Sequence, residues 1–206
     1  LAAYLDEIRL RAEVAEPSVD PVDCGANYDG KTETALLGVA SGLTAAAAGT
    51  PVVAHSADHV PTTEGCAYGH VLDELGVRTD LAPKESADLV DRTGFGFYYQ
   101  PRFVPDVAGV EDRRAETGVR TFFNTVETLV NPANADVHLG SFYHLAFAKR
   151  VCDTFAASHQ NLDTVVMFQG LEGYDDIRPG YTKVVEWRND ELDDYEIETE
   201  EFGMSF

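Results

Sequence analysis

Residues 22–55 read VDCGANYDGKTETALLGVASGLTAAAAGTPVVAH. The two apolar ends, Pro21–Cys24 and Pro51–Ala54, are predicted strands. Between them, Thr34–Ala48 is rich in small residues and is a predicted helix that Gly49 ends as a C-terminal cap. A strand, a helix and a strand in this order indicate a βαβ unit, with parallel strands and a right-handed crossover.

The loop that follows the first predicted strand is a candidate anion site. Residues 25–32 are mostly small or turn-forming. In a βαβ unit, free backbone N–H groups and the helix dipole both face this loop. A complete phosphate-loop motif with Gly-Lys-Ser/Thr spacing is absent. The loop by itself therefore fits either a phosphate site or a plain structural turn.

Further helices and strands alternate along the chain, which predicts an α/β fold with a mostly parallel central sheet flanked by helices. The other predicted helices are Val71–Leu75, Lys84–Thr93, Thr117–Leu129 and His144–Ala157. The other predicted strands are Phe95–Tyr99, Asp136–Phe142, Thr164–Phe168 and a closing antiparallel hairpin of Thr182–Trp187 with Asp194–Glu198. An amphipathic helix at Leu1–Ala12 leads to an expected division into residues 1–16, a fragment of an N-terminal helical domain, and residues 17–206, the α/β domain.

The chain is strongly acidic, with 36 acidic against 15 basic residues and a net charge of −21. This balance disfavours binding to nucleic acid, because contacts to a phosphate backbone need clustered Lys and Arg. The charge has two interpretations, an acidic surface for a partner or adaptation to a high-salt cytoplasm. The acidic residues are spread along the whole chain, which favours the second interpretation.

The cysteines and the apolar segments predict a cytoplasmic protein. Cys24, Cys66 and Cys152 are odd in number and lack Cys-x-x-Cys spacing, so they fit buried, reduced thiols better than disulfides or a zinc site. No secretory signal is visible, and no segment approaches the roughly 18 apolar residues that a membrane span needs.

Two adjacent carboxylates follow a predicted buried strand. Asp175 and Asp176 come just after Thr164–Phe168, and ligands of parallel sheets bind at the carboxyl ends of the strands. Carboxylate oxygens are hard ligands that suit Mg²⁺. The same pair also fits a solvated acidic loop, which is common in so acidic a chain.

Three other side chains are candidates for contacts to a substrate. His55 ends a predicted strand at the carboxyl edge and fits either a hydrogen-bonded structural group or a substrate contact. Arg113 and Arg114 form a basic pair that is able to clamp a carboxylate or phosphate, or to form surface ion pairs with Glu111, Asp112 or Glu116. No catalytic triad or nucleophile elbow is apparent, so an enzyme with this sequence would work by positioning and electrostatics.

Residues Gly118–Asn124 read GVRTFFN, and Leu129–Pro132 read LVNP. They are similar to the pattern G-V-R-T-x-F-N-x-x-G-P-L-x-N-P, and Val71–Val77 and Gly94–Phe97 match further segments of the same family. From Val22 onward the chain therefore resembles the anthranilate phosphoribosyltransferase family, which is related to the pyrimidine nucleoside phosphorylases. The chain is thereby identified as a divergent member of this family, salt-adapted and of halophilic archaeal type.

The resemblance implies Mg²⁺-dependent transfer of phosphoribosyl from phosphoribosyl pyrophosphate to an aromatic amine such as anthranilate. Asp175 and Asp176 match the paired acidic residues expected to bind Mg²⁺, and Arg114 matches the arginine expected to face the anthranilate carboxylate. His55 is expected to help orient the acceptor. The residues that the resemblance assigns to the phosphates are Gly25, Ala26, Asp29, Gly30 and Thr32. A homodimer through the helical domain is also implied.

The chain departs from the family in its phosphate-binding segments. The family's G-T-G-G-D loop falls on Gly25–Asp29, its N-x-S-T on Ala35–Gly38, and its K-H-G-N-R on Ala54–Asp58, where only the histidine is kept. The lysine, asparagine and arginine of the family pattern, which this chain lacks, are cations and donors that would hold an anionic substrate. Three functions therefore stay open: transfer to anthranilate or a similar amine, glycosyl transfer to another acceptor or a nucleoside, and non-catalytic binding of a ligand, nucleic acid or partner.

Overall fold

The structure, a computed structural model, describes residues 1–25, 30–58 and 65–204 of the 206-residue chain. Its strands form one seven-stranded sheet in the order β3-β2-β1-β4-β5-β6-β7. The strands are β1 (Val22–Cys24), β2 (Val52–Ser56), β3 (Phe95–Tyr99), β4 (Val137–Ser141), β5 (Thr164–Phe168), β6 (Tyr181–Arg188) and β7 (Glu191–Glu198). The first five are parallel, and β6 and β7 are antiparallel. The α/β prediction and its closing hairpin are confirmed.

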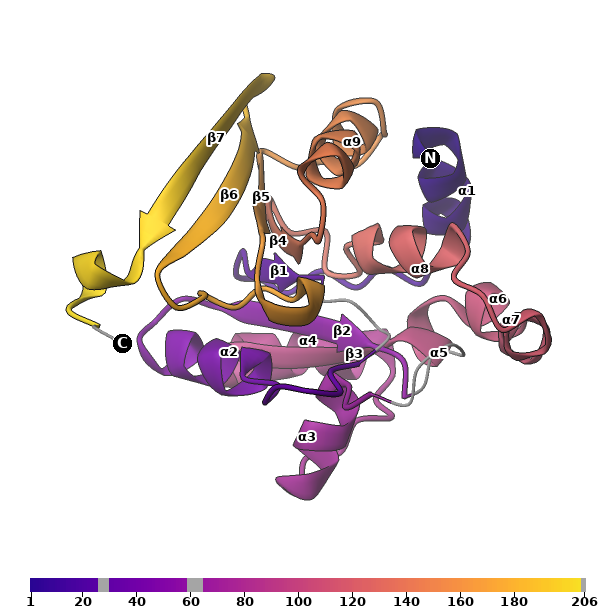
Figure 1. Cartoon of the computed structure of the whole chain (residues 1–206). Helices are drawn as coiled ribbons and strands as arrows, with labels where there is room; N and C mark the ends of the chain where they lie inside the picture. Colours follow the sequence, from indigo (N-terminus) through magenta and orange to yellow (C-terminus); the bar gives the residue numbers. More distant parts are fainter. Residues whose placement is uncertain (26–29, 59–64, 205–206) are drawn as a thin grey trace.

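Helices cover both faces of this sheet (Figure 1). Helices α2 and α3 contribute to the apolar cluster on one face, and α1, α4, α8 and α9 contribute to the cluster on the other. The longer helices are α1 (Ala2–Arg11), α2 (Gly38–Ala47), α3 (Tyr68–Glu74), α4 (Pro83–Thr93), α7 (Glu111–Thr117) and α9 (Leu145–Ala156). The short ones are α5 (Gln100–Phe103), α6 (Pro105–Ala108), α8 (Phe123–Val126), η1 (Glu127–Leu129), η2 (Leu171–Gly173) and η3 (Thr199–Phe202).

The alternation of side chains along the central strands produces these two clusters. Val53 of β2 lies in one cluster, whereas its neighbours Val52 and Ala54 lie in the other. A strand covered by helices on both faces is buried throughout, and the apolar run Val52–Ala54 agrees with this, whereas His55 and Ser56 are buried polar residues at its end. The last hairpin turns at Asn189 and Asp190, whose φ angles of 51° and 62° suit a two-residue turn that matches the strand twist.

Helix α3 begins at Tyr68, three residues before the predicted Val71, and two other predicted helices differ more. Helix α2 begins at Gly38, four residues later than predicted, because the backbone N–H groups just before it bind a side-chain carboxylate instead of starting the helix. The predicted helix Thr117–Leu129 is wrong, because that segment contains the end of α7 and then α8 and η1. Gly118 breaks it by ending α7 in the left-handed conformation, with a φ of 61°.

Helix α1 packs against the α/β core. Leu5 and Ile8 are buried in the larger apolar cluster. Arg9 Nη1 donates to the backbone carbonyls of Val130 at 2.9 Å and Asn131 at 2.8 Å. The N-terminal segment is thus bound to the segment between η1 and β4, more than a hundred residues away in the chain.

Two sequence predictions, buried thiols and the lack of a membrane span, are compared with the structure through the cysteines and the helix lengths. Cys24 is half-buried and Cys152 is buried, but Cys66 is exposed, so the prediction of a buried thiol is wrong for Cys66. Cys66 exchanges two backbone hydrogen bonds with Lys31, which holds it in an isolated bridge at the surface. Within the described ranges, none of the helices is both long and apolar enough to pass through a bilayer.

The strand order reverses beside β1. Strand β2 lies on one side of β1 and β4 on the other. From β1 the chain therefore builds the sheet outward through β2 and β3 in one direction, and from β4 through β5 in the opposite direction. The carboxyl ends of β1 and β4 lie beside such a reversal, and ligands of open α/β sheets bind there. The candidate residues Gly25, His55 and Asp175–Asp176 all come from segments at the carboxyl ends of strands.

Candidate functional site

An anion-binding loop lies just before α2. The backbone N–H groups of Thr32, Glu33 and Thr34 donate to the carboxylate of Glu172 at 2.9, 3.1 and 2.7 Å. The hydroxyls of Thr32 and Thr34 donate to the same carboxylate at 3.2 and 2.5 Å. Burial raises the pKa of Glu172, but these hydrogen bonds outweigh burial and lower the pKa to about 2. Five donors therefore converge on one anion, and Thr32 lies among them as a predicted phosphate residue.

Lys31 lies directly beside this loop, and its side chain is almost fully buried. Its ammonium forms an ion pair with Asp176 and donates to the carbonyl oxygen of Ala35 at 3.2 Å. It also lies 5.3 Å from the centre of the Tyr174 ring, which favours a cation. Lys31 thus holds a positive charge between the anion-binding loop and the paired carboxylates.

Asp175 and Asp176 lie together, as the sequence indicated, but they have different partners. The Tyr68 hydroxyl lies 3.3 Å from both oxygens of the half-buried Asp175 carboxylate. Burial raises the pKa of Asp175, and the neighbouring Asp176 charge raises it further. Asp176 already holds a cation, the Lys31 ammonium. The described residues contain no cluster of three or more metal-binding side chains. One or two carboxylates are enough for Mg²⁺, which keeps water or phosphate oxygens as its other ligands, so this pair fits it.

The remaining predicted phosphate residues are only partly described. Ala26 and Asp29 lie outside the described residues. Gly25 directly follows β1, and a Cβ atom at this position would lie 2.2 Å from the Thr128 carbonyl oxygen, so only glycine fits. Gly30 has a φ of 81°, and its backbone packs directly against that of Gly65. Gly25 and Gly30 thus allow their backbone to pack closely against Thr128 and Gly65, respectively.

His55 is fully buried and faces another side chain of the sheet. Its Nε2 lies 3.4 Å from Oδ1 of Asp23, and its ring packs edge-on against Phe103. His138 of β4 lies on the other side, with Nδ1 2.7 Å from Oδ2 of Asp23. Burial raises the pKa of Asp23, but the two histidines outweigh burial and hold it well below its usual range. His55 thus faces Asp23 within the fold, and a contact from it to a substrate stays a prediction.

Arg114 does bind a carboxylate bidentately, but that carboxylate belongs to the protein. Its Nη1 and Nη2 donate to Glu127 at 2.7 and 3.0 Å, and the side chains are only 6% and 1% exposed. Gln100 also donates to Glu127, at 3.2 Å, and the guanidinium lies 5.8 Å from the centre of the Phe123 ring. The alternative of pairing with Glu111, Asp112 or Glu116 is wrong for Arg114, whereas Arg113 does pair with Glu116 at 2.6 Å.

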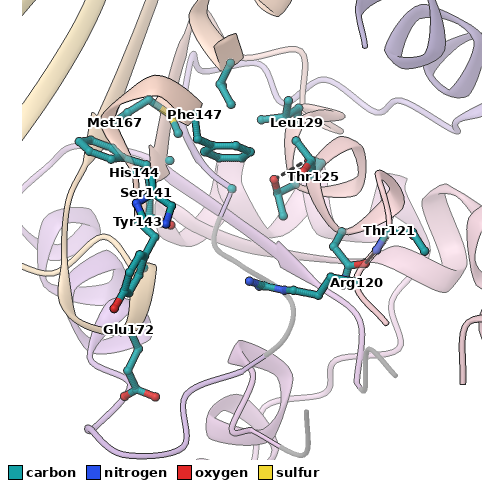
Figure 2. A pocket seen from close by; sticks show the side chains of 17 residues that line it. Arg120, Thr121, Thr125, Leu129, Ser141, Tyr143, His144, Phe147, Met167 and Glu172 are labelled. Atoms are coloured by element: carbon teal, nitrogen blue, oxygen red, sulfur yellow. Dashed lines mark hydrogen bonds between the residues drawn. The ribbon is translucent and has the colours of Figure 1, made fainter. Parts of the chain in front are cut away.

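A cavity of about 270 Å³ adjoins the anion-binding loop, at the carboxyl ends of β1 and β4 (Figure 2). Figure 2 shows Arg120 on one side of the pocket and Tyr143 and Glu172 on the other. Its polar lining includes Thr121, Asn124, Thr125, Thr128, Ser141 and His144, and its apolar lining includes Leu129, Phe142, Phe147, Val151 and Met167. A cavity lined in this way suits a small ring with a polar edge.

The sequence of the chain matches a known protein family. The sequence model described as "Glycosyl transferase family, a/b domain" matches residues 17–206. The chain belongs to this glycosyl transferase family. Anthranilate phosphoribosyltransferase of Burkholderia mallei (strain SAVP1) is 35% identical over 208 residues, which cover 98% of this chain and 58% of the relative. The enzyme of the same name from Paraburkholderia phymatum is 34% identical over 209 residues, with the same coverage.

Solved structures with the same fold agree with this family. Anthranilate phosphoribosyltransferase from Thermus thermophilus superposes with a TM-score of 0.80 and 27% identity, covering 99% of this glycosyl transferase chain and 60% of that structure. The Saccharomyces cerevisiae enzyme in complex with phosphoribosyl pyrophosphate and Mg superposes with a TM-score of 0.79 at 18% identity, covering 99% and 56% of the two chains. The chain thus spans about three fifths of the length of the relatives that it matches.

Several side chains that shape this candidate site were not predicted from the sequence. Lys31 offered a signal, as one of only four lysines in an acidic chain and part of the candidate loop. Glu172 stands three residues before Asp175, but its role in the loop depends on a contact 140 positions away in sequence. The pairing of Asp23 with His138 follows from the register of β1 against β4, which no local pattern reveals. Glu127 stands where the family pattern quoted above has glycine.

Proposed function

We propose that this chain carries the α/β domain of a phosphoribosyltransferase. It transfers the phosphoribosyl group of phosphoribosyl pyrophosphate to an aromatic amine such as anthranilate, with Mg²⁺ as cofactor. Relatives named anthranilate phosphoribosyltransferase, at 35% and 34% identity, support this reaction, and a structural neighbour was solved with the donor and Mg.

One observation carries the proposal. The donors of residues 32–34 and the Lys31 ammonium lie directly beside the paired carboxylates of Asp175 and Asp176. A magnesium pyrophosphate group needs both kinds of partner in one place, donors for its oxygens and carboxylates for its cation. The site lies at the carboxyl edge of the sheet, where the fold binds ligands.

The chemistry follows from where charge develops. When the bond between ribose C1 and pyrophosphate breaks, negative charge collects on the departing pyrophosphate oxygens. The N–H groups of residues 32–34 and the Lys31 ammonium are fixed donors for this charge, and fixed donors need no reorganisation during the reaction. Mg²⁺ bound by Asp175 and Asp176 would supply further positive charge. The amine nitrogen forms the new bond to C1 and loses a proton.

The acceptor side favours a second candidate function. The proposed roles of His55 and Arg114 require both side chains to change partner, since His55 faces Asp23 and Arg114 faces Glu127. Because Glu127 already neutralises Arg114, the geometry favours an acceptor amine without a carboxylate at this position. The reaction stays a phosphoribosyl transfer, and only the acceptor differs.

A comparison of two amines separates these candidates. Pyrophosphate release is measured with phosphoribosyl pyrophosphate and Mg²⁺ in high potassium chloride, with anthranilate or with aniline, which lacks the carboxylate. A clear preference for anthranilate supports the first candidate, and equal or faster reaction with aniline supports the second. Asp176→Asn should lower the rate at least tenfold, whereas Asp193→Asn on the exposed strand β7 serves as the matched control. No release with any amine would refute the proposed reaction.

Assembly, compartment and domain division belong to the same proposal. We take residues 1–16 as a fragment of a helical domain and 17–206 as the α/β domain, with a homodimer formed through the helical part in a salt-rich cytoplasm. Tyr4 and Leu10 of α1 are 54% and 84% exposed, which supports a further contact on this helix. The net charge of −21 supports high-salt adaptation and opposes nucleic acid as a partner. Light scattering at high salt tests the dimer.

A further inference from the structure

One short segment of the chain supplies both of the anions that fill the proposed phosphate site. Glu172 accepts the five hydrogen bonds from residues 32–34, and Asp176, four residues later, holds the Lys31 ammonium. Between them Tyr174 lies against the same ammonium. Residues 172–176 therefore satisfy these donors of the loop and its cation at once.

The arrangement is that of a bound anion. Three N–H groups in sequence that point at one acceptor form a concave site typical of phosphate and carboxylate binding. Thr32, Glu33 and Thr34 are exposed, so their donors lie at the surface, where a ligand is able to reach them. Glu172 itself adopts a left-handed φ of 54°, which is rare for a residue with a side chain and is held here by these hydrogen bonds.

We propose that Glu172 and Asp176 are internal stand-ins for the pyrophosphate of the donor, and that the donor binds by exchange. Phosphate oxygens replace the Glu172 carboxylate on the N–H groups of residues 32–34 and replace Asp176 on Lys31. This inference rests on the proposed function, because it assigns that donor to these groups. The exchange exposes the Asp176 carboxylate, which the proposed function gives to Mg²⁺.

The exchange sets the affinity for the donor. In the ligand-free protein the loop is occupied by its own anion, so a ligand binds only the fraction of molecules in which Glu172 has moved away. The apparent dissociation constant rises as this available fraction falls. Removing the internal anion should therefore tighten binding, although it adds no contact to the ligand.

The experiment titrates inorganic pyrophosphate into the wild-type chain and three variants by calorimetry, with and without Mg²⁺. Glu172→Gln removes the internal charge and is expected to tighten binding about tenfold. Glu74→Gln is the matched control, because it removes the same charge from an exposed side chain of α3, outside residues 31–34 and 172–176. It is expected to change the dissociation constant less than twofold. Lys31→Met is expected to weaken binding at least tenfold, since it removes the buried cation.

Each outcome decides the inference. Tighter binding in Glu172→Gln but not in Glu74→Gln supports exchange. Equal tightening in both variants would mean that only the overall negative charge matters and would overturn it, as would the absence of pyrophosphate binding in all four proteins. Turnover with an amine is measured in parallel. A wild type that turns over, with no tightening in Glu172→Gln, refutes exchange and leaves the proposed function standing. Tightening without turnover supports exchange and refutes the transfer reaction.

Discussion

Two ion pairs of this protein join a cation to a carboxylate, and they differ in how completely they are enclosed. Lys31 and Asp176 lie beside an exposed loop, and the Asp176 side chain keeps 13% of its surface exposed. Arg114 and Glu127 lie between α7 and η1, with side chains 6% and 1% exposed, two direct hydrogen bonds and a third from Gln100. The first pair is placed to exchange partners with a ligand, whereas the second is part of the folded core.

The largest expected effect comes from breaking the enclosed pair. Glu127→Gln leaves the Arg114 guanidinium buried without a counter-charge, and such a loss costs about 3–5 kcal/mol. The free energy of unfolding from urea titration measures it. Glu116→Gln, which breaks only the exposed pair with Arg113, is the control. A loss below about 1 kcal/mol would show that Arg114 and Glu127 are no more tightly coupled than a surface pair.

Breaking the loop pair should cost less. Lys31→Met leaves Asp176 without its cation, but the carboxylate reaches water, so we expect a loss of about 1–3 kcal/mol in the free energy of unfolding. Lys183→Met, whose cation pairs with Asp194 on the exposed hairpin, is the matched control and should lose less. A loss equal to that of Glu127→Gln would remove the distinction between the two pairs.

The Glu172 carboxylate, which the loop binds, should make the free energy of unfolding depend on pH. The pKa of Glu172 is lowered from 4.5 to about 2, so the ionised form is the one that stabilises the fold. This contribution is complete above pH 4.5 and is lost as the pH falls toward 2. At pH 7, Glu172→Gln should lower the free energy of unfolding by about 1–2 kcal/mol, because solvent at the loop screens part of the contact. The difference from wild type, measured by urea titration at each pH, should shrink between pH 4.5 and pH 2. A difference that is constant over this range would contradict the charge-dependent contact.

The smallest effect is expected at Arg113. Its pair with Glu116 joins side chains that are 77% and 63% exposed, so water and salt screen it. Arg113→Ala should change the free energy of unfolding by at most about 0.5 kcal/mol. A thermal melt of this variant beside wild type checks it. A larger change would show that exposure is a poor guide to the strength of ion pairs in this protein.

The local patterns were sufficient for most elements of the fold. Pro83 and Gly94 mark the two ends of α4, because proline suits the first turn and glycine the left-handed cap. The hairpin turn at Asn189 and Asp190 likewise carries residues that tolerate positive φ. Gly118 was present as a signal for the end of α7, but the predicted helix Thr117–Leu129 ran through it.

The candidate site was predictable only in part. The loop after β1 and the paired carboxylates were found from the sequence, since both follow predicted strands. The partners of these groups were not, because Glu172 reaches Thr32 across 140 residues and Lys31 reaches Asp176 across 145. Arg114 was assigned to a substrate carboxylate, whereas the fold brings Glu127 to it.

By itself the sequence determined the order of the strands and of most of the longer helices, the α/β class and the edge of the sheet where charged side chains gather. These follow from periodicity, caps and turns, which act over a few residues. Only the tertiary structure decided which charges meet. Glu172 on residues 32–34, Asp176 on Lys31 and Glu127 on Arg114 are contacts between segments brought together by packing, and a short-range pattern does not encode them.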